Sequence, residues 1–139
     1  MVYLMIAPPS VANDIYITQV GDNLDLDITQ DGTDNEVGNS TTATVINGDN
    51  MNFDITQQGN YNTITATIKG ADYTGLWEFT GSSNTVDLDC SSSASGNCDD
   101  VTLNITTEGD SNAFTFDIGE SADSSNSVVN FVLDGDNNI

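Results

Sequence analysis

A ten-residue pattern recurs along this chain and restricts what the chain can fold into. Residues 26–35 read Leu-Asp-Ile-Thr-Gln-Asp-Gly-Thr-Asp-Asn, and residues 53–62 repeat the pattern as Phe-Asp-Ile-Thr-Gln-Gln-Gly-Asn-Tyr-Asn. A weaker copy occupies residues 103–112. Repeats with a period of roughly 20–50 residues are typical of solenoids, in which each unit buries its apolar face only by stacking on the next unit.

Glycine spacing sets the step of the repeat. Gly48, Gly59, Gly70 and Gly81 follow one another at intervals of 11 residues. Between the glycines, apolar and polar residues alternate, which predicts half-buried β-strands rather than helices. Two such halves make a coil of about 22 residues, so residues 13–139 are expected to form a single all-β domain, a β-solenoid of about five strand–turn–strand coils.

Three stretches lengthen this step. They lie near residues 38–42, 90–98 and 119–125 and are predicted to be loop insertions at the corners of the coils, where solenoids tolerate extra residues. Residues 1–12 are apolar and end in Ser-Val-Ala, which is similar to a signal cleavage site, but they lack a basic segment. We expect them to be an N-terminal arm or the remnant of a secretion signal.

The alternation also assigns faces to side chains. Gln30 and Gln57 fall on the same inward face as the apolar residues of their repeats, whereas Asp27 and Asp54 fall on the outer face. Because a buried amide without a partner is costly, inward Gln and Asn side chains are expected to bond to the same residue type one coil away, which produces amide ladders.

Acidic residues dominate the charge of the chain. It carries 22 acidic residues and one basic residue, Lys69, for a net charge of −21. Such a chain repels nucleic acid and anionic membranes, and no apolar run is long enough to span a membrane. We therefore expect neither nucleic acid binding nor membrane insertion. The chain also repels itself, so assembly is expected to need salt, divalent cations or low pH.

Metal binding remains open at this stage. Asp27 and Asp54 are expected one coil apart on the outer face, where loosely bound Ca²⁺ or Mg²⁺ would relieve their repulsion. A hydrated acidic face without metal is the alternative, and no other cofactor is expected. Gly48 and Gly135 each begin a Gly-Asp-Asn sequence, which is explained by an ordinary turn and lacks the ligand spacing of a calcium loop.

The remaining chemistry is sparse. Cys90 and Cys98 flank a small polar segment, and in a chain without His this spacing favours a disulfide and an oxidising setting. Asn39 begins an Asn-Ser-Thr glycosylation sequon in an expected loop. Without His there is no common general base and no partner for a Ser or Cys nucleophile, so we expect no catalytic residues and no enzyme activity.

The repeat resembles that of curlins, the secreted bacterial subunits that polymerise into curli amyloid fibres. Their repeats read apolar-x-apolar-x-Gln-x-Gly-x-x-Asn-x-apolar, and this chain matches at 26–37 and 53–64 and, with Thr107 in place of Gln, at 103–114. The resemblance implies a secreted solenoid subunit with secretion and nucleation proteins as partners. It implies internal ladder or packing roles for Gln19, Gln30, Gln57, Asn35, Asn62, Asn84 and Asn112, and turns at Gly21, Gly32, Gly59, Gly81 and Gly109.

These observations predict a structural function. No polar capping repeat is recognisable, and residues 129–139 still read as strand and turn, so strand edges are expected to be free to pair with another copy. We expect a subunit of an extracellular curli-like filament, at the cell surface or in a biofilm matrix, that polymerises with itself end to end. The alternative is a soluble β-solenoid adhesion or calcium-dependent binding domain of a surface or phage fibre.

Overall fold

A computed structural model describes residues 13–39, 41–90, 98–119 and 124–139. The expectation for residues 1–12 lies outside these ranges. Within them the chain forms no helix and twelve strands: β1 (Asp14–Ile15), β2 (Thr18–Val20), β3 (Asp25–Asp31), β4 (Glu36–Val37), β5 (Thr44–Asn47), β6 (Met51–Gln58), β7 (Thr63–Lys69), β8 (Tyr73–Thr80), β9 (Thr85–Cys90), β10 (Thr102–Glu108), β11 (Ala113–Ile118) and β12 (Val128–Asp134).

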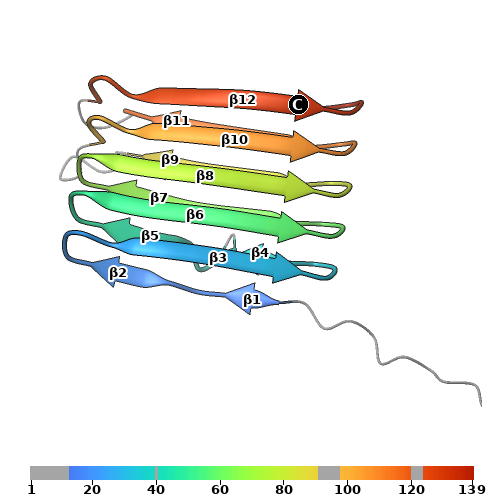
Figure 1. The fold of residues 1–139 in the computed structure, drawn as a ribbon, viewed down its shortest axis with the longest axis horizontal. Coiled ribbons are helices and arrows are strands. Elements are labelled where there is room, and N and C mark those ends of the chain that lie inside the picture. The colour runs from blue at the N-terminus through green and yellow to red at the C-terminus, as the bar shows by residue number, and fades with distance from the viewer. Residues whose placement is uncertain (1–12, 40, 91–97, 120–123) are drawn as a thin grey trace, which may run out of the picture.

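The strands form two parallel sheets that face each other (Figure 1). The front sheet has the order β12-β10-β8-β6-β3. The rear sheet stacks β1 and β2 on β4 and β5, followed by β7, β9 and β11. The chain alternates between the sheets, so each coil contributes one front strand and one rear half-coil. The predicted all-β solenoid is confirmed, and the front sheet has five strands, one for each expected coil.

Register between coils gives the length of the repeat. Ile55 of β6 lies opposite Trp77 of β8, an offset of 22 residues. The offset is 27 between β3 and β6, 28 between β8 and β10, and 26 between β10 and β12. The basic coil is therefore 22 residues long, and the longer coils carry five, six and four extra residues.

One insertion does not lie where we expected it. The extra residues near 38–42 interrupt the rear sheet between β4 and β5 instead of forming a corner, because Val37 and Thr44 both stay paired to β7, opposite Ile64 and Ala66. Reciprocal backbone hydrogen bonds between Asn39 and Thr42, at 2.9 and 3.1 Å, bring the two ends of this loop together. The ladder therefore resumes with only one residue of β7 skipped. The other two insertions fall in the sequence between β9 and β10 and between β11 and β12, and most of their residues lie outside the described ranges.

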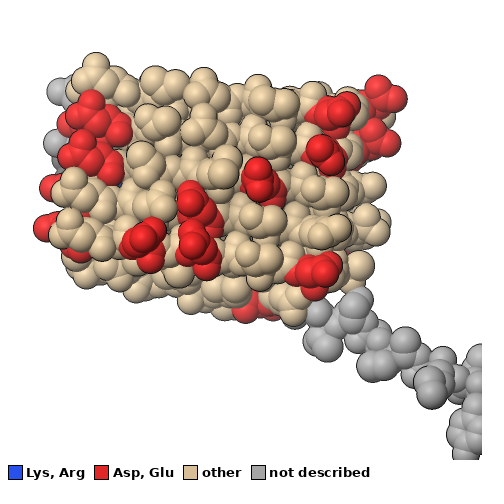
Figure 2. Space-filling view, in the orientation of Figure 1, with Lys and Arg blue, Asp and Glu red and all other residues tan. Residues whose placement is uncertain are grey.

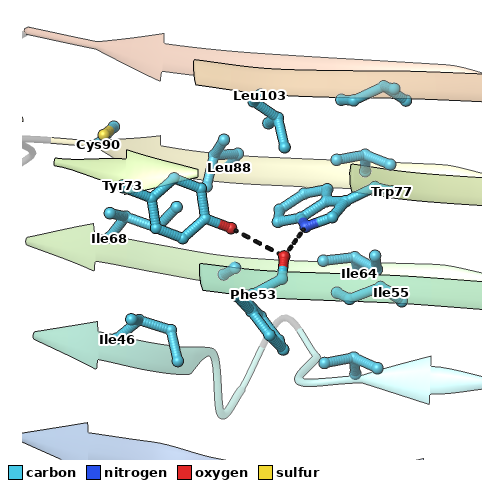
Figure 3. Close-up of a cluster of buried hydrophobic side chains, with 14 of the residues drawn as sticks. Ile46, Phe53, Ile55, Ile64, Ile68, Tyr73, Trp77, Leu88, Cys90 and Leu103 are labelled. Carbon is cyan, nitrogen blue, oxygen red and sulfur yellow. Dashed lines mark hydrogen bonds between the residues drawn. The ribbon is translucent and has the colours of Figure 1, made fainter. Parts of the chain in front are cut away.

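The inward side chains form columns that run along the solenoid. Ile28, Ile55, Trp77, Ile105 and Phe131 are in register in the front sheet and form one such column. Most of the interior is fully buried apolar side chain, which is the main stabilising term for a fold of this kind. Figure 3 shows the part of this core around Phe53, Tyr73 and Trp77.

The two corners have different chemistry. We call the corner after the front strands, at the right in Figure 1, the ladder corner; its turns are 32–35, 59–62, 81–84, 109–112 and 135–138. The opposite one is the cysteine corner, with turns 21–24, 48–51, 70–73, 98–101 and 124–127. At the ladder corner each turn begins with Gly, and the third residue has a positive φ. Coils meet there through the backbone, as in the bond from the Gly81 N–H to the Glu108 carbonyl at 2.9 Å.

Close backbone contact leaves no room for a side chain at Gly59, Gly81, Gly109 and Gly135 of the ladder corner. A Cβ atom at Gly81, which has a φ of 142°, would lie 1.6 Å from the carbonyl oxygen of Gly59. We expect Gly81→Ala to lower the free energy of unfolding by about 2–4 kcal/mol, because both φ strain and a backbone collision must be relieved. Urea denaturation measures this loss. Ser82→Ala, an exposed position in the same turn, is the matched control and should shift stability by less than about 0.5 kcal/mol; equal effects would contradict the assignment.

Candidate assembly surfaces

A continuous ladder of asparagine amides runs along the ladder corner. The Nδ2 group of each Asn donates to the Oδ1 of the Asn in the next coil. The donor–acceptor distances are 3.1 Å for Asn13–Asn35, 2.9 Å for Asn35–Asn62, 2.7 Å for Asn62–Asn84, 2.8 Å for Asn84–Asn112 and 2.7 Å for Asn112–Asn138. The four ladder asparagines expected from the repeat all lie in this ladder. It also includes Asn138, which stands in the repeat place of the last coil, and Asn13, which we did not name.

Both of these residues have a signal in the sequence. Asn13 stands 22 residues before Asn35, one coil length, and Asn138 stands three residues after Gly135. That second spacing has a structural cause, because the amide also donates to the carbonyl of the turn Gly three residues earlier at Asn62, Asn84, Asn112 and Asn138. The bond from Asn62 to Gly59 is 3.0 Å long, and Asn138 makes the same bond to Gly135 at 3.0 Å. The Gly-x-x-Asn spacing therefore identifies a ladder position.

Removal of one ladder amide leaves its neighbours unpaired. Asn62 accepts from Asn35 and donates to Asn84, and it is fully buried. We expect Asn62→Ala to lower the free energy of unfolding by about 2–4 kcal/mol, since buried amides lose their partners on both sides. Chemical denaturation measures this change. Asn60→Ala, at an exposed position of the same turn, should cost less than about 0.5 kcal/mol. A cost at position 62 no larger than that at 60 would show that the ladder does not stabilise the fold.

The glutamine ladder is short. Gln57 Nε2 donates to Gln30 Oε1 at 2.7 Å, and both side chains are buried. The next residue in this column is Phe79, followed by Thr107 and Leu133. Since Phe79 offers no donor, the Gln57 Oε1 atom has no hydrogen-bond partner among the described residues. The ladder therefore has two rungs.

Gln19 does not belong to this ladder, and the expected ladder role is wrong. It lies in the rear sheet opposite Ile46, and its amide donates to the carbonyl of Gly21 at 3.4 Å. The reason is that the turn after Gln19 lies at the cysteine corner, where an apolar residue such as Leu24 takes the place that Asn has at the ladder corner. Turn glycines serve both corners: Gly21 and Gly48 lie at the cysteine corner, and Gly32, Gly59, Gly81, Gly109 and Gly135 lie at the ladder corner, all with positive φ.

Asp27 and Asp54 lie opposite each other on the outer face of the front sheet, as the repeat predicted. The Asp54 carboxylate, however, already accepts two hydrogen bonds. Its Oδ1 accepts from the Leu76 N–H at 2.7 Å, and its Oδ2 accepts from Asn52 at 3.3 Å. Within the described ranges, no group of three or more His, Cys, Asp or Glu side chains is arranged to hold a metal ion. The two aspartates are therefore a pair whose second member already has a structural role.

Asp54 takes this role because the backbone next to it is turned inward. Pairing between β6 and β8 includes Asn52 and resumes at Ile55, and skips the two residues between them. The Phe53 carbonyl points into the core, where it accepts from the Trp77 indole Nε1 at 3.0 Å and from the Tyr73 hydroxyl at 3.5 Å (Figure 3). Burial raises the pKa of the Tyr73 hydroxyl, so it stays protonated as a donor. The Asp54 carboxylate replaces the missing backbone acceptor.

Acidic residues also gather on the rear sheet. Asp89 of β9 lies opposite Asp117 of β11 and two residues after Asp87. Burial, and next the charges of Asp87 and Asp117, raise the pKa of the Asp89 carboxyl above 3.8. The ionised form is therefore disfavoured in the folded state. It follows that the fold is more stable at pH values below 3.8 than above the raised pKa, as far as this group is concerned.

Neutralising Asp89 should remove this effect. We expect Asp89→Asn to raise the melting temperature at pH 7 and to reduce the stability that the wild type gains when pH falls toward 4, because the unfavourable charge is absent at all pH values. Thermal unfolding at pH 7 and pH 4 measures both. Asp31→Asn, which removes one charge from the front sheet, is the control for net charge. If both variants have the same pH dependence, the rear acidic group has no specific effect.

Cys90 and Cys98 form a disulfide, with Cα atoms 5.7 Å apart and both residues fully buried. The predicted pairing is thus confirmed. The expected glycosylation residue, Asn39, lies in the loop between β4 and β5. Its Nδ2 donates to the Tyr16 hydroxyl at 2.7 Å, and its Oδ1 accepts from two backbone N–H groups of the same loop. In this structure the side chain therefore closes the loop.

The two end strands of the front sheet differ in character. The edge strand β12 has exposed apolar residues, with 39% exposure for Phe131 and 43% for Leu133. Phe131 packs edge-on against Phe114 and Phe116, with ring centroids 5.4 and 4.8 Å apart. At the other end, Ile28 and Gln30 of β3 are 7% and 4% exposed. The β12 end is therefore the more apolar surface.

The front face of the molecule is acidic. Figure 2 shows Asp and Glu side chains toward both corners and in a few central positions of this face, and no Lys or Arg there. On the outer face of β3, Asp25, Asp27 and Asp31 alternate with inward residues. On β12 the corresponding outer positions are Val128, Asn130, Val132 and Asp134. The two ends thus differ in charge as well as in apolar exposure.

Comparison of the chain with family models, with curated proteins and with solved structures finds no match. Among the described residues, no helix has the length and apolarity needed to cross a membrane. The curlin resemblance therefore depends on the repeat pattern alone and stays a prediction.

Proposed function

We propose that this protein is a structural subunit that polymerises with itself into an extracellular filament, by stacking the β12 end of one copy on the β3 end of the next. One observation carries the proposal. The exposed inward residues Phe131 and Leu133 of β12 are in the same columns as Ile28 and Gln30 of β3. A second copy placed on β12 in the register of the coils below would continue these columns.

Backbone hydrogen bonding supports the same arrangement. In a parallel ladder, alternate residues bond to the neighbours on opposite sides. The Val128 N–H donates to the Val101 carbonyl at 2.7 Å, so the N–H groups of Val129, Phe131 and Leu133 point to the open edge of β12. Unpaired strand edges of this kind pair readily with another strand. A second copy supplies β3, a strand of the same length, seven residues.

The charge distribution favours joining opposite ends. When β12 meets β3, Asn130 faces Asp27 of the second copy and Val128 faces its Asp25, so these two carboxylates gain uncharged neighbours, and only Asp134 meets a like charge, that of Asp31. Joining two β3 ends would instead bring acidic rows together, which is unfavourable. Joining unlike ends also leaves each copy with one free end, so growth continues and gives a filament rather than a closed dimer.

The extracellular setting has two supports. A disulfide is typical of proteins that fold in an oxidising compartment. The curlin resemblance of the repeat is to secreted subunits. The net charge of −21 makes assembly dependent on screening, so filaments should grow faster in moderate salt or millimolar Ca²⁺ than in low salt.

Electron cryo-microscopy of the purified protein in moderate salt tests the proposal. Five coils spaced by about 4.8 Å predict filaments with a 4.8 Å layer line and a subunit rise of roughly 24 Å. Dispersed particles at all concentrations would overturn the filament and favour the soluble adhesion domain. Loss of the fold on chelation with EDTA would instead favour calcium-dependent binding.

A charge at the β12 end should stop growth. Phe131→Lys places an ammonium group in the column that the second copy must cover, and we expect it to abolish elongation, because burial of an unpaired charge is costly. Thioflavin fluorescence and electron microscopy measure growth. Val132→Lys is the matched control, since it changes the neighbouring residue on the outer face, which is 60% exposed. This control should still elongate. Normal growth of Phe131→Lys, with its circular dichroism unchanged, would show that β12 is not an assembly surface.

A further inference from the structure

The cysteine corner changes its construction in the last two coils. The third residues of its five turns stack on one another, all with a φ between 53° and 64°: Asn23, Asn50, Asp72, Asp100 and Asn126. Two positions before them, the first three coils have Gly21, Gly48 and Gly70. The fourth coil has Cys98 at this position and the fifth has Ser124. The disulfide thus lies where a turn glycine stands in the earlier coils.

The disulfide ties this turn to the rear sheet. Cys90 is the last residue of β9 and lies in register between Ile68 of β7 and Ile118 of β11. Cys98 begins the turn that leads to β10. Because the bond joins the two residues directly, the position of Cys98 is fixed relative to the core column that contains Cys90.

The last coil is attached to this fixed turn by side-chain hydrogen bonds. The Ser124 and Ser127 hydroxyls both donate to the Cys98 carbonyl, at 2.7 and 2.9 Å. The Ser125 N–H and hydroxyl both donate to the Asp99 carboxylate at 2.8 Å, and these bonds hold the pKa of that carboxyl below its usual range. At the earlier turns of this corner, the described residues show single carboxylate bonds, such as that from the Ala71 N–H to Asp49 at 2.8 Å.

The last coil depends on this attachment more than the inner coils do. It contains β11 and β12, whose inward residues are only partly buried because no further coil covers them. Strands with little buried apolar surface open at low free-energy cost. The same strands form the β12 end to which a second copy would bind.

We propose that the Cys90–Cys98 disulfide is a redox switch for assembly: when it forms, residues 98–100 are fixed and the last coil docks, and when it is reduced, the last coil opens and the β12 end is lost. The inference rests on the proposed filament function. Reduction breaks the S–S bond and gives two thiols, with two electrons and two protons supplied by a dithiol, which itself closes to a cyclic disulfide. Formation is the reverse exchange with a disulfide oxidant such as oxidised glutathione.

Burial of the two cysteines determines when the disulfide can be reduced. Both cysteines are 0% exposed, so a thiolate cannot reach the bond in the closed coil. Reduction therefore acts before the last coil has docked or after it has opened. Filaments that have already formed should keep the bond, because the neighbouring copy holds the last coil closed.

The docking of the last coil can be measured without filaments. We would use a Leu26→Lys background, in which a charge at the β3 end blocks stacking and leaves the last coil unchanged. Amide hydrogen exchange in β11 and β12 is then compared between the disulfide-bonded chain and a Cys90→Ala, Cys98→Ala variant. We expect exchange in these two strands to be faster by about tenfold or more in the variant, with β6 to β8 unchanged.

Two controls separate the switch from general destabilisation. Ser124→Ala with Ser127→Ala keeps the disulfide and removes two bonds to Cys98, and it should also speed exchange in β11 and β12. Ile46→Ala creates a cavity in the second coil and should leave the last coil protected. Equal protection of β11 and β12 with and without the disulfide would overturn the switch, whether or not the protein forms filaments.

The order in which reductant is added tests the consequence for assembly. In the wild-type chain, dithiothreitol present during refolding should slow filament growth by about tenfold or more, whereas the same reagent added to finished filaments should leave them intact. Equal growth of the reduced and oxidised chains would overturn the switch. Absence of filaments from the oxidised chain would instead overturn the filament function, and the exchange experiment would still decide whether the disulfide controls the last coil.

Discussion

The asparagine amide at the ladder corner is the group on which regular stacking depends. It donates to the Gly carbonyl of its own turn and also to the Asn of the next coil, as Asn62 does to Gly59 and Asn84. One side chain therefore fixes both the shape of a turn and the spacing to its neighbour. Turn glycines then bring the backbones close enough for the coils to bond directly. The contacts at this corner hold neighbouring strands of the front sheet in register. The inward apolar side chains are therefore aligned in columns.

Much of this fold could be predicted because its determinants are local and repeated. The glycine step gave the 22-residue coil, the alternation gave the two faces, and the repeats at 26–35 and 53–62 placed Asn35 and Asn62 in the ladder. Gln19 was assigned wrongly because a Gln-x-Gly sequence precedes turns at both corners. The two corners are distinguished by the fourth turn residue, which is Asn in every turn of one corner and Leu24, Met51, Tyr73, Val101 or Ser127 at the other.

What could not be predicted depends on contacts between coils. Counting residues gave an excess near 38–42, but only the pairing of Val37 and Thr44 to β7 shows that the ladder resumes inside the rear sheet. The inward carbonyl of Phe53 is bonded by Tyr73 and Trp77, which belong to the next coil. The repeat that contains Phe53 therefore gives no sign of this inward turn. Some carboxylates also accept hydrogen bonds from the backbone, which the net charge of the chain does not indicate. Asp22, Asp49 and Asp110 each accept a backbone N–H from the next coil, which offsets part of the repulsion within an acidic stack.

The inward carbonyl of Phe53 makes the coils of one chain non-interchangeable. Trp77 and Tyr73 reach this carbonyl because Gly75 between them has no side chain; a Cβ there would lie 2.9 Å from both the Phe53 oxygen and the Tyr73 hydroxyl. The contact between the second and third coils is therefore built from residues that the other coils lack. In a stack of near-identical repeats, one coil could pair with the wrong neighbouring coil. In this chain, the bonds from Tyr73 and Trp77 to the Phe53 carbonyl can form only between the second and third coils. Each molecule thus folds in one order of coils, and a filament built from it would have a defined phase along its whole length.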